Sequence, residues 1–210
     1  MKQTVSKIFC SLSFLCVAWM TYETSFYHWT ETEILFGRLM MAGLVFGAIG
    51  DVFLLGTSKS AFLGGLATFL VGHIFYGLAF FVLVAQGIKR LQLAWIVGSA
   101  LVTLIQTFLI WNELSPAFRD PSKRSLKFPS MMYVGVISGV LLMSFLSFRA
   151  SESRVEISVR LVRVLAVYLF YLSDICVARA SILSTDKTNL NGFIGLPLYY
   201  IAQLLLASFL

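Results

Sequence analysis

The stretch Gly37–Leu55 reads GRLMMAGLVFGAIGDVFLL and carries no charge between Arg38 and Asp51. It belongs to an apolar run, Ile34–Leu55, which is long enough to cross a bilayer, since a helix needs about 20 apolar residues to do so. The run therefore predicts a membrane-spanning helix. A carboxylate at that depth costs several kcal/mol unless it is paired, hydrated or protonated. Asp51 is thus a candidate functional residue.

The whole sequence has the composition of an integral membrane protein. Of its 210 residues, 59% are hydrophobic and 12% are charged, whereas about 25% of a soluble domain is charged. The net charge of +6 does not indicate a nucleic-acid partner, because most basic residues fall in two connections, Arg119–Lys127 and Arg149–Arg163, where they would meet lipid headgroups. The three cysteines lie in apolar segments without paired spacing, so we expect neither a disulfide framework nor a metal site.

Long apolar runs recur along the sequence and predict an all-α, polytopic transmembrane helix bundle in one domain, residues 1–210. Seven spans are expected, at about 5–22, 34–56, 62–86, 91–111, 129–148, 161–183 and 192–210. The first run has no small-residue cleavage site, so we interpret it as a span rather than a signal peptide. Basic residues slightly favour an N-terminus on the inner side. The expected location is a bacterial inner membrane or a eukaryotic endomembrane.

A second acidic residue, Asp174, lies inside another apolar run, Val164–Leu183. The second and sixth spans are an even number of crossings apart, so they run in the same direction. Asp51 lies about five residues from the end of its span and Asp174 about nine, a difference in depth of roughly 6 Å. Both carboxylates are therefore expected in the same half of the bilayer, where they can share a site.

Other polar side chains in the spans are weaker candidates. His73 and Tyr76 share a helix face at a spacing of three, yet a lone buried histidine is often only a structural hydrogen-bonding residue. Tyr200 and Gln203 in the last span could orient a water molecule or simply join two helices. Ser173 has no nucleophile-elbow motif around it, which disfavours an acyl-enzyme.

Two further patterns in the spans concern packing and metal binding. Gly43, Gly47 and Gly50 form a small-residue face that lets another helix approach closely. Catalytic zinc usually needs three protein ligands, and nothing in the spacing of His73 and the two aspartates supports such a site. We therefore expect no metal and no cofactor.

Four ordered patterns, GDVFLL (50–55), GHIFYGLAF (72–80), YLSDICVA (171–178) and LPLYYIAQLLLA (196–207), resemble the YhhN-type family of multi-pass membrane proteins. Characterised members of that family are lysoplasmalogenases. The family usually has eight spans, and the first span here looks like the family's second, so the family's first span is missing either from this sequence or from this branch. The resemblance implies Asp51 and Asp174 as the reactive pair, with a substrate pocket lined by His73, Tyr76, Ser173, Tyr200 and Gln203.

The activity that the resemblance implies is cleavage of the vinyl-ether bond of a lysoplasmalogen, giving a fatty aldehyde and a glycerophospho-ethanolamine or -choline. Two carboxylates suit it, because one can protonate the vinyl ether while the other stabilises the cation and deprotonates water. The sequence does not distinguish the two roles, although its deeper position slightly favours Asp174 as the acid. The expected partners are the bilayer and a lysophospholipid. Two alternatives stay open, a small proton-coupled transporter and a non-catalytic lipid-binding membrane protein.

Overall fold

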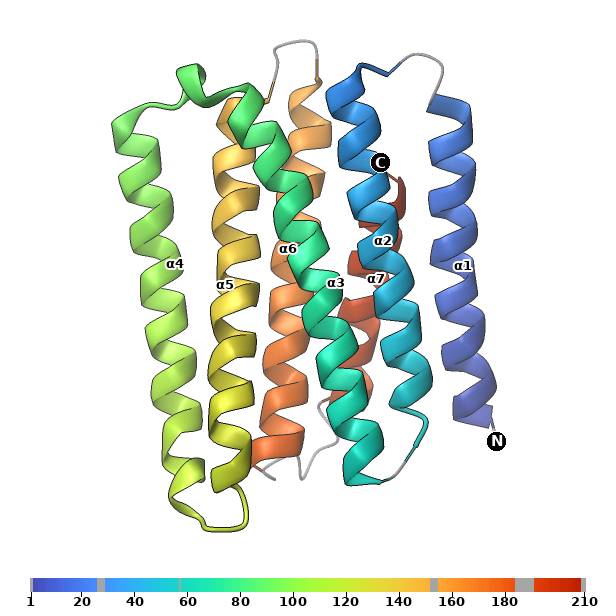
Figure 1. The fold of residues 1–210 in the computed structure, drawn as a ribbon, viewed down its shortest axis with the longest axis vertical. Coiled ribbons are helices and arrows are strands. Elements are labelled where there is room, and N and C mark those ends of the chain that lie inside the picture. The colour runs from blue at the N-terminus through green and yellow to red at the C-terminus, as the bar shows by residue number, and fades with distance from the viewer. Residues whose placement is uncertain (1, 26–28, 57, 152–154, 184–190, 209–210) are drawn as a thin grey trace.

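The computed structural model describes residues 2–25, 29–56, 58–151, 155–183 and 191–208. Within these ranges the protein is helical, and its seven α-helices run alternately up and down in a bundle (Figure 1). They are α1 (Lys2–Ser25), α2 (Glu31–Phe53), α3 (Lys59–Gln86), α4 (Leu93–Leu114), α5 (Lys127–Ala150), α6 (Ile157–Ala178) and α7 (Leu196–Ser208). The predicted all-α bundle is therefore confirmed.

Six stretches of the described residues are long and apolar enough to cross a membrane. They correspond to the predicted spans from the second to the seventh and include α2 to α7 with their flanking turns. α1 corresponds to the remaining predicted span and is not among the six. The protein is thus a multi-pass membrane protein.

Local sequence signals explain where several helices begin. α2 starts at a capping box, in which the Thr30 hydroxyl accepts a hydrogen bond from the Glu33 amide while the Glu33 carboxylate accepts one from the Thr30 amide. Ser58 caps α3 by accepting from the Ala61 amide. Pro197 lies in the first turn of α7, where its missing N–H leaves no hydrogen bond unmade.

The sixth and seventh spans include turns that are not α-helical. The sixth α-helix stops at Ala178, and the chain continues to Leu183 as a π-helical turn, Arg179–Leu183. A second π-helical turn, Asn191–Gly195, precedes α7. Hydropathy does not distinguish α- from π-helical hydrogen bonding, so these turns could not be seen in the sequence. They lie at the end of the bundle where α6 and α7 meet the candidate site.

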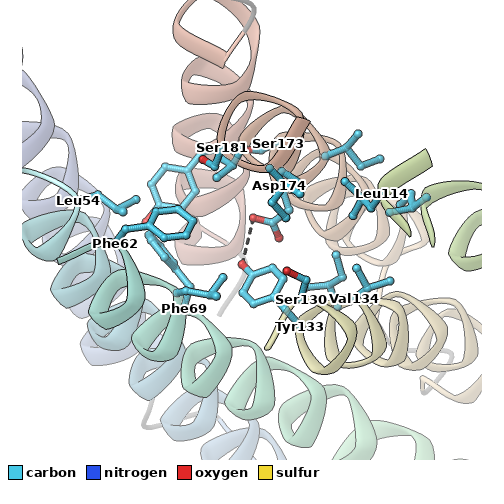
Figure 2. A pocket seen from close by; sticks show the side chains of 18 of the residues that line it. Leu54, Phe62, Phe69, Leu114, Ser130, Tyr133, Val134, Ser173, Asp174 and Ser181 are labelled. Atoms are coloured by element: carbon cyan, nitrogen blue, oxygen red, sulfur yellow. Dashed lines mark hydrogen bonds between the residues drawn. The ribbon is translucent and has the colours of Figure 1, made fainter. Parts of the chain in front are cut away.

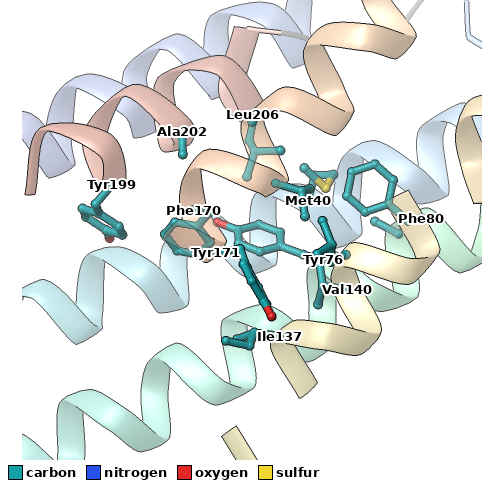
Figure 3. Packing of buried hydrophobic residues seen from close by; sticks show 14 of the residues in the cluster. Met40, Tyr76, Phe80, Ile137, Val140, Phe170, Tyr171, Tyr199, Ala202 and Leu206 are labelled. Carbon is teal, nitrogen blue, oxygen red and sulfur yellow. The ribbon is translucent and has the colours of Figure 1, made fainter. Parts of the chain in front are cut away.

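The packing order of the helices places α4 and α1 on opposite sides of the bundle (Figure 1). α2 packs on α3, α3 on α5, α6 on α7, and α1 on both α7 and α2. α4 contacts mainly α5, and its outer face exposes apolar side chains suited to lipid, including Leu101, Leu104, Ile105, Phe108 and Leu109. Between the helices, Tyr76, Phe80, Val140, Phe170 and Leu206 are among the residues that fill the core (Figure 3).

Candidate functional site

Asp51 lies in the last turn of α2 and is buried, with 5% of its surface exposed. Its Oδ2 atom accepts two hydrogen bonds from hydroxyl groups on other helices. Ser11 Oγ on α1 lies 2.6 Å away, and Tyr199 OH on α7 lies 3.0 Å away. Lys7, one turn before Ser11, adds an electrostatic attraction to the carboxylate. Each of these partners stabilises the carboxylate, whereas burial of the group disfavours its charge.

A series of hydrogen bonds extends behind Tyr199 and points toward Asp51. Tyr76 OH donates to Gln203 Oε1 at 2.8 Å, and Gln203 Nε2 donates to Tyr199 OH at 3.1 Å. Tyr199 then donates to Asp51. Because every donor in the series faces the same way, each bond polarises the next in favour of the charge on Asp51.

The glycines of α2 make room for this series. A side chain at Gly43 would overlap the Tyr76 ring, and a Cβ at Gly47 would lie 2.6 Å from Gln203 Nε2. The small-residue face expected from the sequence therefore receives an aromatic ring and an amide. It also admits α3 itself, since a Cβ at Gly72 would lie 3.0 Å from the Gly43 carbonyl oxygen.

Asp174 lies on α6 with a different set of neighbours. Tyr133 OH on α5 donates to its Oδ1 atom at 3.2 Å, as the dashed line in Figure 2 shows. His73 Nε2 on α3 lies 3.3 Å from its Oδ2 atom. By hydrogen-bond geometry Oδ2 has no partner among the described residues, His73 included, so the 3.3 Å approach of Nε2 is a close contact between the two ionisable groups rather than a formed hydrogen bond. Asp174 thus faces one hydroxyl donor and one imidazole.

The His73 ring is held in a fixed orientation. Its Nδ1 atom lies 2.7 Å from the Phe69 carbonyl oxygen, one turn earlier on α3. The ring stacks on Phe170, with centroids 4.7 Å apart, and meets the rings of Tyr76 and Tyr133 edge-on. This packing points Nε2 at Asp174.

Both aspartates line one cavity of about 90 Å³. Its walls are mainly apolar, with side chains such as Leu54, Phe62, Phe69, Leu114 and Val134 around the carboxylates (Figure 2). Ser130, Ser173 and Ser181 add hydroxyl groups, and Tyr133 and Tyr199 add the two phenols that bond the carboxylates. Two acids from α2 and α6 therefore line one mainly apolar cavity.

The other predicted site residues occupy three kinds of position. Ser173 lines the cavity. His73, Tyr76 and Gln203 are not cavity-lining residues: His73 contacts Asp174, Gln203 donates to Tyr199, and Tyr76 donates to Gln203. Tyr200 packs edge-on against Tyr199, and its buried hydroxyl group finds no hydrogen-bond partner among the described residues.

Three residues that contact the carboxylates were not predicted as site residues. Ser11 and Tyr133 occupy helices for which the sequence suggested no functional role, and Tyr199 directly precedes the predicted Tyr200 in the last span. A signal did exist for Tyr199, since its spacing of four from Gln203 matches the observed hydrogen bond. None existed for Ser11 or Tyr133, which depend on how α1 and α5 are rotated.

Within the described ranges, no group of three or more His, Cys, Asp and Glu side chains is arranged to hold a metal ion. Arg179, in the π-helical turn after α6, does not neutralise Asp174. Its guanidinium lies 3.3 Å from Glu113 at the exposed end of α4 instead. The described ionisable side chains around the two carboxylates therefore include Asp51, Asp174 and His73, with Lys7 at the border of the site.

Comparison with known proteins agrees with this architecture. The sequence model of the YhhN family matches residues 2–210. The chain belongs to the YhhN family. No curated protein and no solved structure matches it. In this YhhN-family protein, the four patterns noted in the sequence supply Asp51, His73, Asp174 and Tyr199, all of which lie at or next to the cavity.

Proposed function

We propose that this YhhN-family protein is an intramembrane hydrolase that cleaves the vinyl-ether bond of lysoplasmalogens. The observation that carries the proposal is that two aspartates from different helices line a single apolar cavity at membrane depth. Buried carboxylates are costly, and a pair of them around one chamber is the arrangement that acid/base hydrolysis of an ether needs. The resemblance to lysoplasmalogenases of this family supplies the substrate class.

The reaction divides naturally between two carboxyl groups. One carboxylic acid gives its proton to the β-carbon of the vinyl ether, whose double-bond electrons form the new C–H bond and leave an oxocarbenium ion. Water adds to the α-carbon while the other carboxylate takes a water proton. The resulting hemiacetal then breaks its bond to the glyceryl oxygen, which receives that proton, and the hemiacetal O–H proton returns to the first carboxylate. Aldehyde and alcohol leave, and both aspartates regain their starting states.

The size and lining of the cavity suit the reacting end of the lipid. At about 90 Å³ it is smaller than pockets of about 300–1,000 Å³ that enclose whole ligands. It would hold the vinyl-ether group with one or two water molecules, while the headgroup and the rest of the alkenyl tail lie outside. Apolar walls keep bulk water from the oxocarbenium ion and strengthen its attraction to a carboxylate.

The test is aldehyde release from a lysoplasmalogen by purified protein in detergent. Asp51→Asn and Asp174→Asn should each lower turnover by about 100-fold or more, as expected for loss of general acid or base catalysis. Asp120→Asn is the matched control, because Asp120 lies in the exposed α4–α5 connection, where it accepts hydrogen bonds from Ser122.

Activity should also survive a chelator. Full turnover in both intramembrane variants would contradict the two-aspartate mechanism. Absence of release by well-folded protein would favour the transport or lipid-binding alternative. A detergent assay separates these cases because a transporter has no sealed compartment to fill there.

A further inference from the structure

The two aspartates differ in the hydrogen-bonding groups that surround their carboxyl groups. Asp51 accepts from two hydroxyl groups, those of Ser11 and Tyr199, on the same oxygen. Asp174 accepts from one hydroxyl group, Tyr133, on Oδ1. Its other oxygen faces a ring nitrogen of His73. The protonation of Asp174 therefore depends on the state of that nitrogen.

The protonation of His73 Nε2 can be inferred from the hydrogen bond of the second ring nitrogen, Nδ1. Nδ1 lies 2.7 Å from the Phe69 carbonyl oxygen, which can only accept a hydrogen bond, so Nδ1 carries a proton. In a neutral imidazole the remaining nitrogen, Nε2, then has a lone pair and no hydrogen. This lone pair would point at Asp174 Oδ2.

A lone pair on Nε2 and a charged carboxylate oxygen would repel each other at 3.3 Å in a buried site. A single proton between the two atoms removes the repulsion. It sits either on Oδ2, which then donates to neutral His73, or on Nε2, which then donates as an imidazolium to charged Asp174. Both arrangements hold one proton and have no net charge.

We propose that His73 and Asp174 share one proton, which makes Asp174 the proton donor of the site and leaves Asp51 as the carboxylate that activates water. The catalytic part of this statement rests on the proposed hydrolysis. The shared proton itself rests on geometry alone. His73 lies behind Asp174 rather than at the cavity wall, so it is a positioning residue that acts through the aspartate.

Proton transfer to the substrate fits this assignment. When the shared proton moves to the β-carbon of the vinyl ether, the His73–Asp174 pair goes from neutral to one negative charge as the substrate gains one positive charge. The new charges are opposite and adjacent, and the site as a whole does not change its charge. During breakdown of the hemiacetal, its O–H proton returns to Asp174 and restores the pair.

A purely structural role for His73 would explain the packing of its ring. It would not explain why Nε2 faces the Asp174 carboxyl group. Stacking on Phe170 and the bond to Phe69 already fix the ring. Nε2 is not needed for either contact, yet it faces an acid that lines the cavity.

The shared proton can be tested without any enzyme assay, because the protein has only two histidines, His28 and His73. In a His28→Gln background, ¹⁵N-histidine NMR of the protein in detergent reports His73 alone. We expect a protonated Nδ1 and an Nε2 signal that moves to that of an ordinary unprotonated imidazole nitrogen in Asp174→Asn. An unprotonated Nδ1, or an Nε2 signal that Asp174→Asn leaves in place, would overturn the proposal.

A kinetic measurement then tests the role of the pair in turnover. His73→Gln should lower kcat by about 10- to 100-fold, the range typical of groups that hold an active-site ligand in place, with little change in KM. The control is Phe80→Leu, two turns further along α3 in the apolar core, which should lower thermal stability without this selective effect on kcat. Equal kcat in His73→Gln and the parent would overturn the assignment of Asp174 as proton donor.

The two measurements separate the inference from the proposed hydrolysis. An NMR signature of the shared proton in a protein that releases no aldehyde would support the His73–Asp174 pair and contradict the hydrolase. Aldehyde release that depends on both aspartates, without that signature, would support the hydrolase and contradict the pair.

Discussion

The two carboxylates of this site occupy different surroundings although they share a cavity. Asp51 is held by Ser11 and by the series from Tyr76 through Gln203 to Tyr199. Asp174 is held by Tyr133 and His73. Pairs of acids that divide acid and base roles generally do so because their environments differ in this way.

Replacement of Tyr199 by phenylalanine tests the support of Asp51 at the level of one atom. The variant keeps the ring that stacks on Phe170 but removes the donor to Asp51 and leaves Gln203 Nε2 without its acceptor. We expect turnover to fall about 10-fold or more, and stability to fall by about 1–3 kcal/mol because a buried polar group loses its partner. Rates of aldehyde release and thermal unfolding in detergent measure the two effects.

The neighbouring Tyr200→Phe is the matched control. Its hydroxyl group is buried without a partner in the described part of the chain, so removing it should leave stability unchanged or slightly raised. Turnover should also be retained. If Tyr200→Phe lowered turnover as much as Tyr199→Phe, the result would favour the substrate contact first expected for Tyr200. It would then contradict a special role for the hydrogen bonds that lead from Tyr76 to Asp51.

At the scale of the helices, α2 acts as the wall against which the site is assembled. Its glycines leave space for Tyr76 and Gln203, and Gly72 of α3 allows that helix to approach the Gly43 carbonyl. The small-residue spacing in the sequence correctly indicates a close approach at this face. It could not indicate that a side-chain amide from α7 would occupy the space at Gly47.

Gly47→Ala should therefore impair the site more than the fold. Its Cβ would lie 2.6 Å from Gln203 Nε2 and 3.4 Å from Tyr199 OH, so the amide must move and the hydrogen bonds toward Asp51 must lengthen. We expect a clear loss of turnover with a modest loss of thermal stability. Gly135→Ala on α5 is the control, since no described atom lies within 4 Å of its added methyl group. Comparable losses of turnover in both variants would contradict this role for Gly47.

The helices also show which features of the site could be predicted from the sequence and which could not. Because the second and sixth spans are an even number of crossings apart, the sequence predicted that Asp51 and Asp174 lie in the same half of the bilayer. In the structure both residues line one cavity. Ser11 and Tyr133 stayed hidden because apolar residues cover both the lipid-facing and the core-facing sides of a membrane helix. Hydropathy then fixes the length of a helix but not its rotation, and rotation decides which hydroxyl group reaches a carboxylate.

At the scale of the whole molecule, the cavity lies toward one end of the bundle. Residues of the α4–α5 connection and of the π-helical turn after α6 contribute to it, among them Leu126, Ser181 and Ile182. Lys123 Nζ donates to the Ile182 carbonyl oxygen at 2.7 Å and joins these two segments. The start of α1 lies at the same end (Figure 1). The basic residues Lys7, Arg119, Lys123, Arg124 and Lys127 therefore surround the end that contains the site.

The opposite end of the bundle carries the basic residues Arg38, Lys89, Arg90, Arg149, Arg160 and Arg163, so the difference between the two ends is small. Because basic residues near short connections are retained on the cytoplasmic side, the slight excess at the site end, where Lys2 and Lys59 also begin helices, predicts that this end faces the cytoplasm. Cysteines introduced at Ser125, in the α4–α5 connection, and at Lys89, in the α3–α4 connection, are both exposed and lie at opposite ends of the bundle. In a background without Cys10, Cys16 and Cys176, an impermeant maleimide should label Lys89→Cys in intact cells and Ser125→Cys only in inverted vesicles. Labelling of both from one side would contradict the alternating bundle. The opposite pattern would keep the bundle but turn the site to the outer face, so that the lysophospholipid would have to enter from the outer leaflet.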